Sequence, residues 1–208
     1  MQLPLGVQAA TAGFVLGRLL LKPPAAALVA SLGDQAMQAA WPLDDPDSRR
    51  GLAILSDGTG QPSALEVEYK RLFVRESATR VELRSAVRRR EVDAAATRAE
   101  LREIYRRDRL SVAGTVSVYD DQVGTQLLYL ADRLASAAQA ALRGDAEAAD
   151  QAARAGLWLR ENHLDPVINE VLDAIEQRAH TPLYRALPPL TRGFLAEHRR
   201  ASGQLVRS

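Results

Sequence analysis

The chain has 208 residues, with 27 Lys and Arg against 26 Asp and Glu, so its formal net charge is only +1. Apolar residues make up 47% and charged residues 25%, which is typical of a soluble globular protein and excludes a disordered chain or a collagen. The sequence contains no cysteine, which excludes disulfides, thiolate zinc, iron–sulfur ligation and a cysteine nucleophile, and fits a reducing compartment. The near-balance of charge disfavours partners that bind the whole surface, such as DNA or an anionic membrane.

The first predicted element is an amphipathic helix that ends at Pro23 and Pro24, because proline lacks an N–H and disfavours the helical region for its predecessor. Its apolar contacts come from Phe14, Val15, Leu16, Leu19 and Leu20. The segment lacks the basic start of a secretory signal, and polar residues interrupt its apolar run, which disfavours a transmembrane span. With no export signal, we expect a cytoplasmic protein that does not bind membranes.

A second helix is predicted over residues 24–40, with Pro24 near its start. A polar loop is expected to follow, and it contains Ser48-Arg49-Arg50-Gly51-Leu52, which looks like a twin-arginine export motif. This motif lies far from the N-terminus, and no long apolar segment follows it. We therefore interpret it as a coincidental match within the loop.

Two capping boxes predict the starts of later helices, since a hydroxyl and a glutamate three residues on each satisfy a free backbone N–H. Ser63 and Glu66 form the first box, and Thr97 and Glu100 form the second. The first of these helices has four apolar residues on one face: Leu65, Tyr69, Leu72 and Phe73.

Residues 71–110 are the basic part of the chain, with twelve Arg against seven Asp and Glu and a net charge of +5. One interpretation is a patch for an acidic partner or a nucleic-acid backbone. The other is a solvated helical surface with i,i+4 pairs such as Glu76–Arg80. Tyr105 is the single aromatic residue of the stretch 75–109, which favours the solvated surface over a site for base stacking.

The clearest predicted helix follows residues 111–118, which form an extended linker or one short strand and do not change the fold class. Asp120 or Asp121 is expected to cap this helix, and Gly144 to end it. Its inward residues recur every three or four positions: Val123, Leu127, Leu130, Leu134, Ala138 and Leu142.

Three further helices are predicted, one over residues 145–162 and two that open at Pro166 and Pro182. The last helix is expected to fray from Glu197 and to end in a flexible tail over residues 201–208. Together these elements predict an all-α fold, a single-domain helical bundle of about eight to nine helices that spans residues 1–208.

Catalytic motifs are absent, since the sequence has no G-x-G-x-x-G, P-loop, H-E-x-x-H or G-x-S-x-G. Three histidines lack a ligand partner at helical spacing and are expected at helix ends or on the surface: His163, His180 and His198. The pairs Asp120–Asp121 and Glu66–Glu68 are better explained as caps or solvated side chains than as acid–base catalysts. We therefore expect a protein without enzyme activity, cofactor or metal.

Four blocks of sequence have a recognisable order and spacing. They are Leu-Gly-Arg-Leu-Leu-Leu-Lys-Pro-Pro at 16–24, Leu-Glu-Val-Glu-Tyr-Lys-Arg-Leu-Phe-Val at 65–74, Asp-Gln-Val-Gly-Thr-Gln-Leu at 121–127, and a C-terminal pair at 159–166 and 184–195. The last three are similar to the motifs E-Y-x-R-L-F-V, D-H-x-G-x-x-L and F-L-x-x-H-L-x-P with F-Y-x-x-L-A-x-L-T-x-x-F-L. Together the blocks resemble the TorD/DmsD/NarJ family of redox-enzyme maturation chaperones over nearly the whole chain.

The resemblance implies an all-α cytoplasmic chaperone without catalytic turnover. Members bind the twin-arginine signal peptide, and often the body, of a molybdopterin-containing oxidoreductase subunit, aid cofactor insertion and delay export. A signal peptide has a basic end and an apolar stretch, so its receptor needs an apolar groove with nearby carboxylates. The implied partners are the catalytic subunit of such an oxidoreductase and its leader peptide, not nucleic acid, and the chain is expected to be a monomer or a domain-swapped dimer.

The matching blocks contain the candidate peptide-binding residues: Tyr69, Arg71, Phe73, Tyr119, Asp120, Asp121, Gln122, Gly124 and Gln126. Tyr69 and Phe73 share a helix face and either line a groove or belong to the plain core. Asp120 and Asp121 could meet arginines of the peptide. Gly124 could allow a backbone to approach closely.

The chain departs from the family pattern at four places, two of which are Val118-Tyr119 in place of Glu-Pro and Val167 in place of Trp. Gln122 stands where the family has histidine, so a histidine-based pH or nucleotide role is not implied here. The arginine-rich residues 75–90 replace a Gly/Pro-rich stretch that often contacts the peptide. An alternative from a different functional class is an α-helical nucleic-acid-binding regulator that uses residues 75–109.

Overall fold

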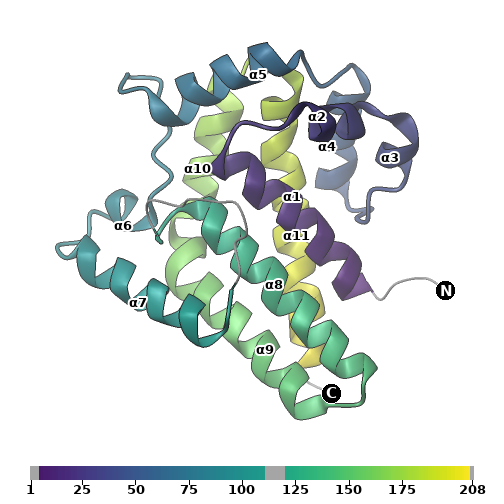
Figure 1. Ribbon diagram of the computed structural model, residues 1–208, viewed down its shortest axis with the longest axis vertical. Helices are drawn as coiled ribbons and strands as arrows, with labels where there is room; N and C mark the ends of the chain where they lie inside the picture. Colours follow the sequence, from purple (N-terminus) through teal and green to yellow (C-terminus); the bar gives the residue numbers. More distant parts are fainter. Residues whose placement is uncertain (1–4, 111–119, 207–208) are drawn as a thin grey trace.

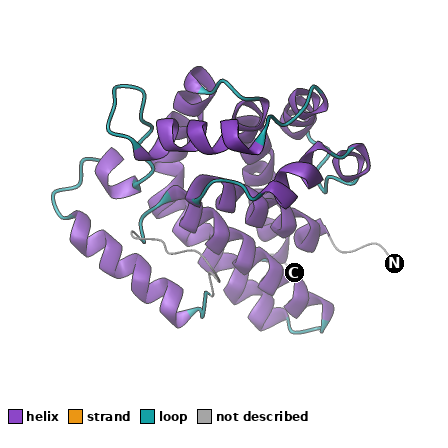
Figure 2. Cartoon of the chain, turned by 45° about the horizontal axis from the view of Figure 1, so that its top comes forward, coloured by secondary structure: helices purple, strands orange, loops and turns teal. Residues whose placement is uncertain are grey.

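The computed structural model describes residues 5–110 and 120–206, and all regular elements in these residues are helices, as Figure 2 shows. The α-helices are α1 (Leu5–Leu21), α2 (Ala26–Gly33), α3 (Gln35–Ala39), α4 (Pro46–Ser56), α5 (Pro62–Tyr69), α6 (Ser85–Arg88), α7 (Ala94–Arg107), α8 (Val123–Leu142), α9 (Ala146–Leu159), α10 (Asp165–Arg178) and α11 (Pro182–Leu205). Two π-helical turns, Lys70–Val74 and Arg160–Leu164, continue α5 and α9. The predicted all-α fold class is therefore confirmed.

Long helices from both halves of the chain form the bundle. Helix α1 packs on α8, α8 packs on α9, and α11 packs on α4 and α1 (Figure 1). The short helices α2 to α5 lie at one end, and α6 and α7 lie to the side of α8. Leu16, Leu127, Leu172 and Leu187 come from four different helices and are almost completely buried in one shared core. Segments far apart in sequence therefore depend on one another for burial.

Small residues let α1 and α8 pack closely. A Cβ placed on Gly17 would lie 2.9 Å from the carbonyl oxygen of Gly124, and a Cβ on Gly124 would lie 2.8 Å from the carbonyl oxygen of Gly17. A Cβ on Gly13 would lie 2.9 Å from the Cβ of Ala131. Only glycine permits such an approach, so the two backbones touch at these positions.

Two N-terminal predictions differ from the structure. The helix predicted over residues 24–40 divides at Asp34, whose extended backbone ends α2 and whose carboxylate caps α3. The predicted polar loop around Ser48–Leu52 is helical, because the Asp45 carboxylate accepts two backbone N–H groups at the start of α4. The motif that looks like a twin-arginine signal therefore lies on a helix.

The predicted helix caps are wrong at three places. Helix α5 begins at Pro62, which leaves Ser63 inside its first turn. Helix α7 is capped by the carboxylate of Asp93, which lies four residues before Thr97. Helix α8 begins after Gln122, because the two aspartates before it bond to α7 and to the start of α6.

The C-terminal helix is longer and better packed than predicted. Helix α11 continues to Leu205, and Ala201 and Ser202 in its last turns are buried. The expectation of fraying from Glu197 is therefore wrong, because these turns pack against the bundle. Residues 207–208 of the predicted tail lie outside the described residues.

Several helices are shorter than the sequence pattern indicates, and α3 and α6 have only five and four residues. The linker or strand predicted over residues 111–118 lies outside the described residues. Within the two described ranges, no helix has both the length and the apolar character that crossing a bilayer requires.

Candidate functional site

The block similar to E-Y-x-R-L-F-V covers α5 and the π-helical turn after it. The rings of Tyr69 and Phe73 are 5.3 Å apart, and the ring of Phe73 is 5.8 Å from that of Tyr184 on α11. Tyr69 is buried, whereas Phe73 is half-buried. The structure thus brings the two predicted aromatic residues together, in a three-ring cluster at the edge of the core.

Glu68 and Arg71 of the same block join this turn to the α10–α11 connection. The buried carboxylate of Glu68 accepts the backbone N–H groups of His180 and Thr181 at the start of α11. Arg71 donates to Glu68 at 2.9 Å and to the carbonyl oxygen of Arg178 at 2.6 Å. Burial acts to raise the pKa of Glu68, but hydrogen bonds from Thr181, His180 and Arg71 outweigh it and lower the pKa. The expected solvated position of Glu68 is therefore wrong.

Asp121 and Gln126 form a buried polar link between α8 and α6. The carboxylate of Asp121 accepts the N–H of Ala86 at 3.3 Å, and its carbonyl oxygen accepts the N–H of Ser85 at 2.9 Å. Gln126 donates to the hydroxyl of Ser85 at 2.8 Å and to the carbonyl oxygen of Asp121 at 3.3 Å. Both Asp121 and Gln126 are 0% exposed, and burial raises the pKa of Asp121. A direct contact between these two side chains and a peptide would require α6 to move.

The remaining predicted contacts surround the same end of α8. Asp120 pairs with Arg102 of α7 at 2.8 Å, and Gln122 forms an antiparallel bridge with the residue before α6. Gly124 faces α1, so its open side is filled by that helix. Tyr119 lies outside the described residues. The described candidates thus fall into two groups, on α5 and at the start of α8, and their role as peptide contacts stays a prediction.

Two of the three histidines are buried, contrary to expectation. His198 is 0% exposed, and neither of its ring nitrogens has a hydrogen-bond partner among the described residues. Burial, together with Arg160 and Arg199, lowers its pKa to about 3. His163 lies 5.5 Å from the ring of Trp158, and burial lowers its pKa as well. Both are therefore core side chains that are neutral in the folded protein at pH 7.

Ion pairs occupy most of the arginine-rich segment. The predicted i,i+4 pair Glu76–Arg80 forms at 2.9 Å. Seven other arginines of the segment also pair with carboxylates: Arg71, Arg84, Arg88, Arg89, Arg102, Arg106 and Arg107. Tyr105 is buried and donates to the carbonyl oxygen of Asp120 at 3.1 Å, so it is not presented for stacking. A paired surface describes this segment better than an open nucleic-acid patch.

An apolar groove that the sequence did not indicate runs along α1, on the face opposite Gly13 and Gly17, and α2, α3 and α4 form its other wall. Two hollows of about 140 and 230 Å³ share Val15 and Leu28, so they adjoin. The main apolar side chains of this α1–α4 groove are Phe14, Val15, Leu28, Met37, Trp41 and Leu52. Met37 is 55% exposed, and an exposed apolar surface of this kind is typical of a binding site.

One end of the α1–α4 groove is basic, and an acidic turn follows in sequence after Trp41 and Pro42, which line its other hollow. Arg18 and Lys22 line one end. The other end continues along the chain into the acidic turn Asp44–Asp47, where Asp44 is 91% exposed and pairs with the exposed Arg49 at 2.9 Å. Such exposed pairs are worth less than about 1 kcal/mol, so Asp44 can exchange this partner for another cation. No cluster of three or more metal-ligating side chains occurs in the described ranges.

The family described as "Nitrate reductase delta subunit" matches residues 24–172, from the start of α2 into α10. No curated protein matches the chain significantly. The family match confirms the resemblance to the TorD/DmsD/NarJ group, whose general role is molybdoenzyme maturation and not catalysis. The chain therefore belongs to the nitrate reductase delta subunit family of molybdoenzyme maturation chaperones.

Proposed function

We propose that this protein is a cytoplasmic chaperone that binds the twin-arginine signal peptide of one molybdopterin-containing oxidoreductase subunit and delays its export until the cofactor is inserted. The observation that carries the proposal is the α1–α4 groove, which is apolar along its length and whose lining residue Pro42 is followed in sequence by the acidic turn Asp44–Asp47. A twin-arginine leader has the matching parts, since an arginine pair precedes its apolar stretch.

The length of the groove supports this occupant. From Thr11 to Lys22, which both line the groove, α1 advances by about 16 Å at 1.5 Å per residue. A helical peptide of about eleven residues covers the same distance, and the apolar stretch of an export signal has roughly 7–15 residues. An amphipathic helix in an apolar groove is a common mode of peptide recognition.

We infer the orientation of the bound peptide in the groove from the charged residues of the protein. The arginine pair of the peptide meets the Asp44–Asp47 turn, and its apolar stretch passes over Trp41 and Leu28. Arg18 and Lys22 at the other end repel the arginine pair and so disfavour the reverse orientation. Complementary charge of this kind selects register and speeds association more than it adds affinity.

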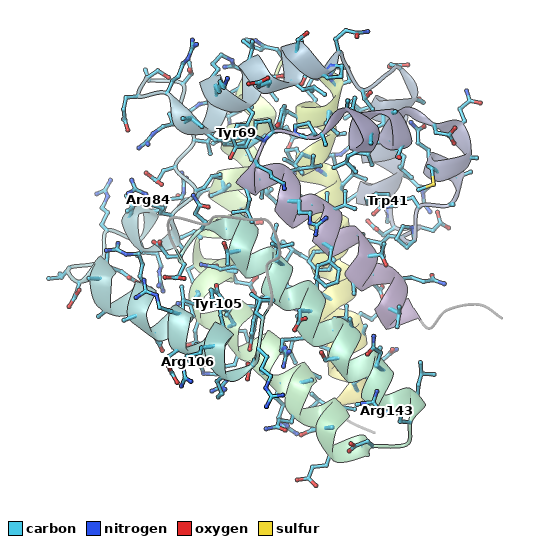
Figure 3. All side chains as sticks on the ribbon, in the orientation of Figure 1. Trp41, Tyr69, Arg84, Tyr105, Arg106 and Arg143 are labelled. Atoms are coloured by element: carbon cyan, nitrogen blue, oxygen red, sulfur yellow. The ribbon has the colours of Figure 1, made fainter. Side chains whose placement is uncertain are left out.

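The residues predicted on α5 and at the start of α8 are a separate proposal for the peptide site. In Figure 3, Tyr69 is labelled below α5 and Trp41 beside the α2–α4 helices, well apart from each other. We favour the α1–α4 groove, because the carboxylate of Asp121 is internal whereas that of Asp44 is exposed. Asp44→Asn is therefore expected to weaken leader binding by about threefold, and Asp121→Asn to change it less. A larger effect of Asp121→Asn in calorimetric titration would favour the α8 site instead.

Met37→Arg is expected to weaken binding of a synthetic twin-arginine leader at least tenfold, or about 1.4 kcal/mol. The substitution places a charge in the apolar groove and repels the basic peptide. The chain has two tryptophans, so Trp158→Phe leaves Trp41 in the groove as the only one, and its emission reports occupancy during a titration.

Leu142→Arg is the matched control, because Leu142 is also apolar and exposed but lies at the end of α8. It makes the same change in charge and is expected to leave the affinity within twofold. Equal weakening by Met37→Arg and Leu142→Arg would exclude the groove. Absence of binding to leaders from a panel of molybdoenzymes would exclude the proposed function itself.

A further inference from the structure

A second groove lies between α7 and the α8–α9 pair. Two hollows of about 470 and 630 Å³ share Arg107 and Ala155, so they form one continuous depression, the α7–α9 groove. Ile104 and Trp158 line the smaller hollow together with the carboxylates Glu100 and Glu103, and Trp158 is 45% exposed. The larger hollow is mainly polar and begins at Arg107, where α7 ends.

The polar part of this groove is strongly basic. Four arginines line the larger hollow, and Asp108 is the one carboxylate among its described lining residues: Arg107, Asp108, Arg109, Arg133 and Arg143. Arg107 pairs with Asp108 and Arg133 with Asp132, and Glu100 and Glu103 lie at the other end of the groove, in the smaller hollow. Asp108 already accepts hydrogen bonds from Arg107 at 2.9 Å and from the hydroxyl of Tyr129 at 2.5 Å. The negative charge of Asp108 is therefore already paired within the protein, whereas Arg109 and Arg143 are exposed at the rim of the groove.

The side chains of the α7–α9 groove are held in position before any partner arrives. Arg133 donates to the carbonyl oxygen of Asp108 at 3.0 Å and lies 5.7 Å from the centre of the Tyr129 ring. The backbone of Arg109 has a φ of 55°, a left-handed conformation that is rare for a side chain of this size and turns the chain after α7. Trp158 rests against the ring of His163. A preformed surface loses little entropy when it binds a partner.

We propose that the α7–α9 groove binds an acidic segment of a partner protein. An apolar side chain of that segment packs on Trp158, and its carboxylates pair with Arg109 and Arg143. Tryptophan and arginine are the residues that most often dominate binding energy at protein interfaces, and the arginine fork matches a carboxylate in two hydrogen bonds. The arginines of the larger hollow repel a twin-arginine leader there, so this groove takes a different segment from the one proposed for the α1–α4 groove.

Charge complementarity selects the acidic protein segment over a nucleic acid. Trp158 is the one aromatic side chain among the described residues that line the groove, whereas binding of single strands uses successive aromatic platforms. Most arginines of α6 and α7 outside the groove are already paired with carboxylates, so no continuous basic track leads away from it.

The test uses the full chain with Trp41→Phe, which leaves Trp158 as the only tryptophan. The probes are two synthetic peptides, Leu-Leu-Glu-Glu-Glu-Glu and Leu-Leu-Lys-Lys-Lys-Lys, and a 20-nucleotide single-stranded DNA. We expect the acidic peptide to shift Trp158 emission to shorter wavelength in a saturable titration, and the basic peptide to cause no shift. We also expect the affinity to fall at least fivefold in 1 M NaCl, because salt screens the pairs.

Charge-reversal variants of the rim arginines test whether the acidic peptide binds in the α7–α9 groove. Arg109→Glu with Arg143→Glu is expected to weaken acidic-peptide binding at least tenfold, and Arg143→Glu alone keeps the test valid if the double variant does not fold. Arg154→Glu is the control, since Arg154 is an exposed α9 residue outside the groove. The proposal is overturned if the acidic peptide does not shift Trp158 emission, or if the basic peptide binds with equal affinity. It is also overturned if Arg154→Glu weakens binding of the acidic peptide as much as the groove variants do, or if the DNA binds and the acidic peptide does not. None of these results bears on leader binding, which Trp41 reports in a separate groove.

Discussion

Gly124→Ala is expected to lower the free energy of unfolding by about 2 kcal/mol. The new Cβ would lie 2.6 Å from Cγ of Leu21 and 2.8 Å from the carbonyl oxygen of Gly17, so α1 and α8 must move apart. Overpacking of this kind lowers the free energy of unfolding by roughly 3 kcal/mol, and the higher helix propensity of alanine offsets about 1 kcal/mol of this loss. In a thermal melt, the loss corresponds to a decrease of roughly 4–8 °C for a domain of this size.

Gly33→Ala is the matched control for this prediction. Gly33 ends α2, and a Cβ there would lie 3.5 Å from the hydroxyl oxygen of Thr59, an ordinary contact. The same chemical change is therefore expected to alter stability by less than about 0.5 kcal/mol. Urea unfolding of both variants at pH 7.5 compares them directly. A Gly124→Ala protein as stable as the Gly33→Ala protein would contradict backbone contact between α1 and α8.

His198 is expected to make the protein less stable in weak acid. Burial lowers its folded pKa to about 3, below the ordinary value of 6.5, so the unfolded chain binds a proton that the folded chain does not. The stability from this histidine is complete above pH 6.5 and is lost as the pH falls from 6.5 toward 3. Between pH 7.5 and pH 5, the loss is about 2 kcal/mol.

The variant His198→Phe tests this effect, because it fills the site with a ring that cannot be protonated. The difference in unfolding free energy between pH 7.5 and pH 5 is expected to be smaller by about 2 kcal/mol in this variant than in the unaltered chain. Carboxylates contribute to both proteins equally, so the comparison isolates His198. An unchanged slope in His198→Phe would show that the buried imidazole is not responsible.

Periodicity predicted the long helices well, because each pattern reflects one buried face. In α8, Leu127, Leu130 and Leu134 are all 0% exposed, as expected from their spacing. Leu142 continues the pattern but is 66% exposed, since it lies in the last turn beyond the packed part of the helix. Short helices such as α3 were not predicted, because one turn carries too little pattern.

The candidate site was predicted less well, because burial of polar groups depends on distant partners. The buried state of Asp121 follows from Ser85 and Ala86, 36 and 35 residues earlier, and that of Glu68 from the start of α11. No local spacing contains this information. The α1–α4 groove was missed for the same reason, since four helices contribute to it, although Trp41 next to Pro42 was a signal that could have been used.

The pairing of α4 with α11 has a consequence for the synthesis of the chain. Helix α11 begins more than 120 residues after α4 ends, so α4 has only its smaller contacts with earlier helices until α11 emerges from the ribosome. At roughly 5–20 residues per second, this delay lasts about 6–25 seconds. Contacts that are so distant in sequence form late and slow the folding of the whole chain. The α1–α4 groove, one wall of which is α4, therefore reaches its final form only after α11 has been made, and the peptide site proposed there is among the last parts of the fold to form.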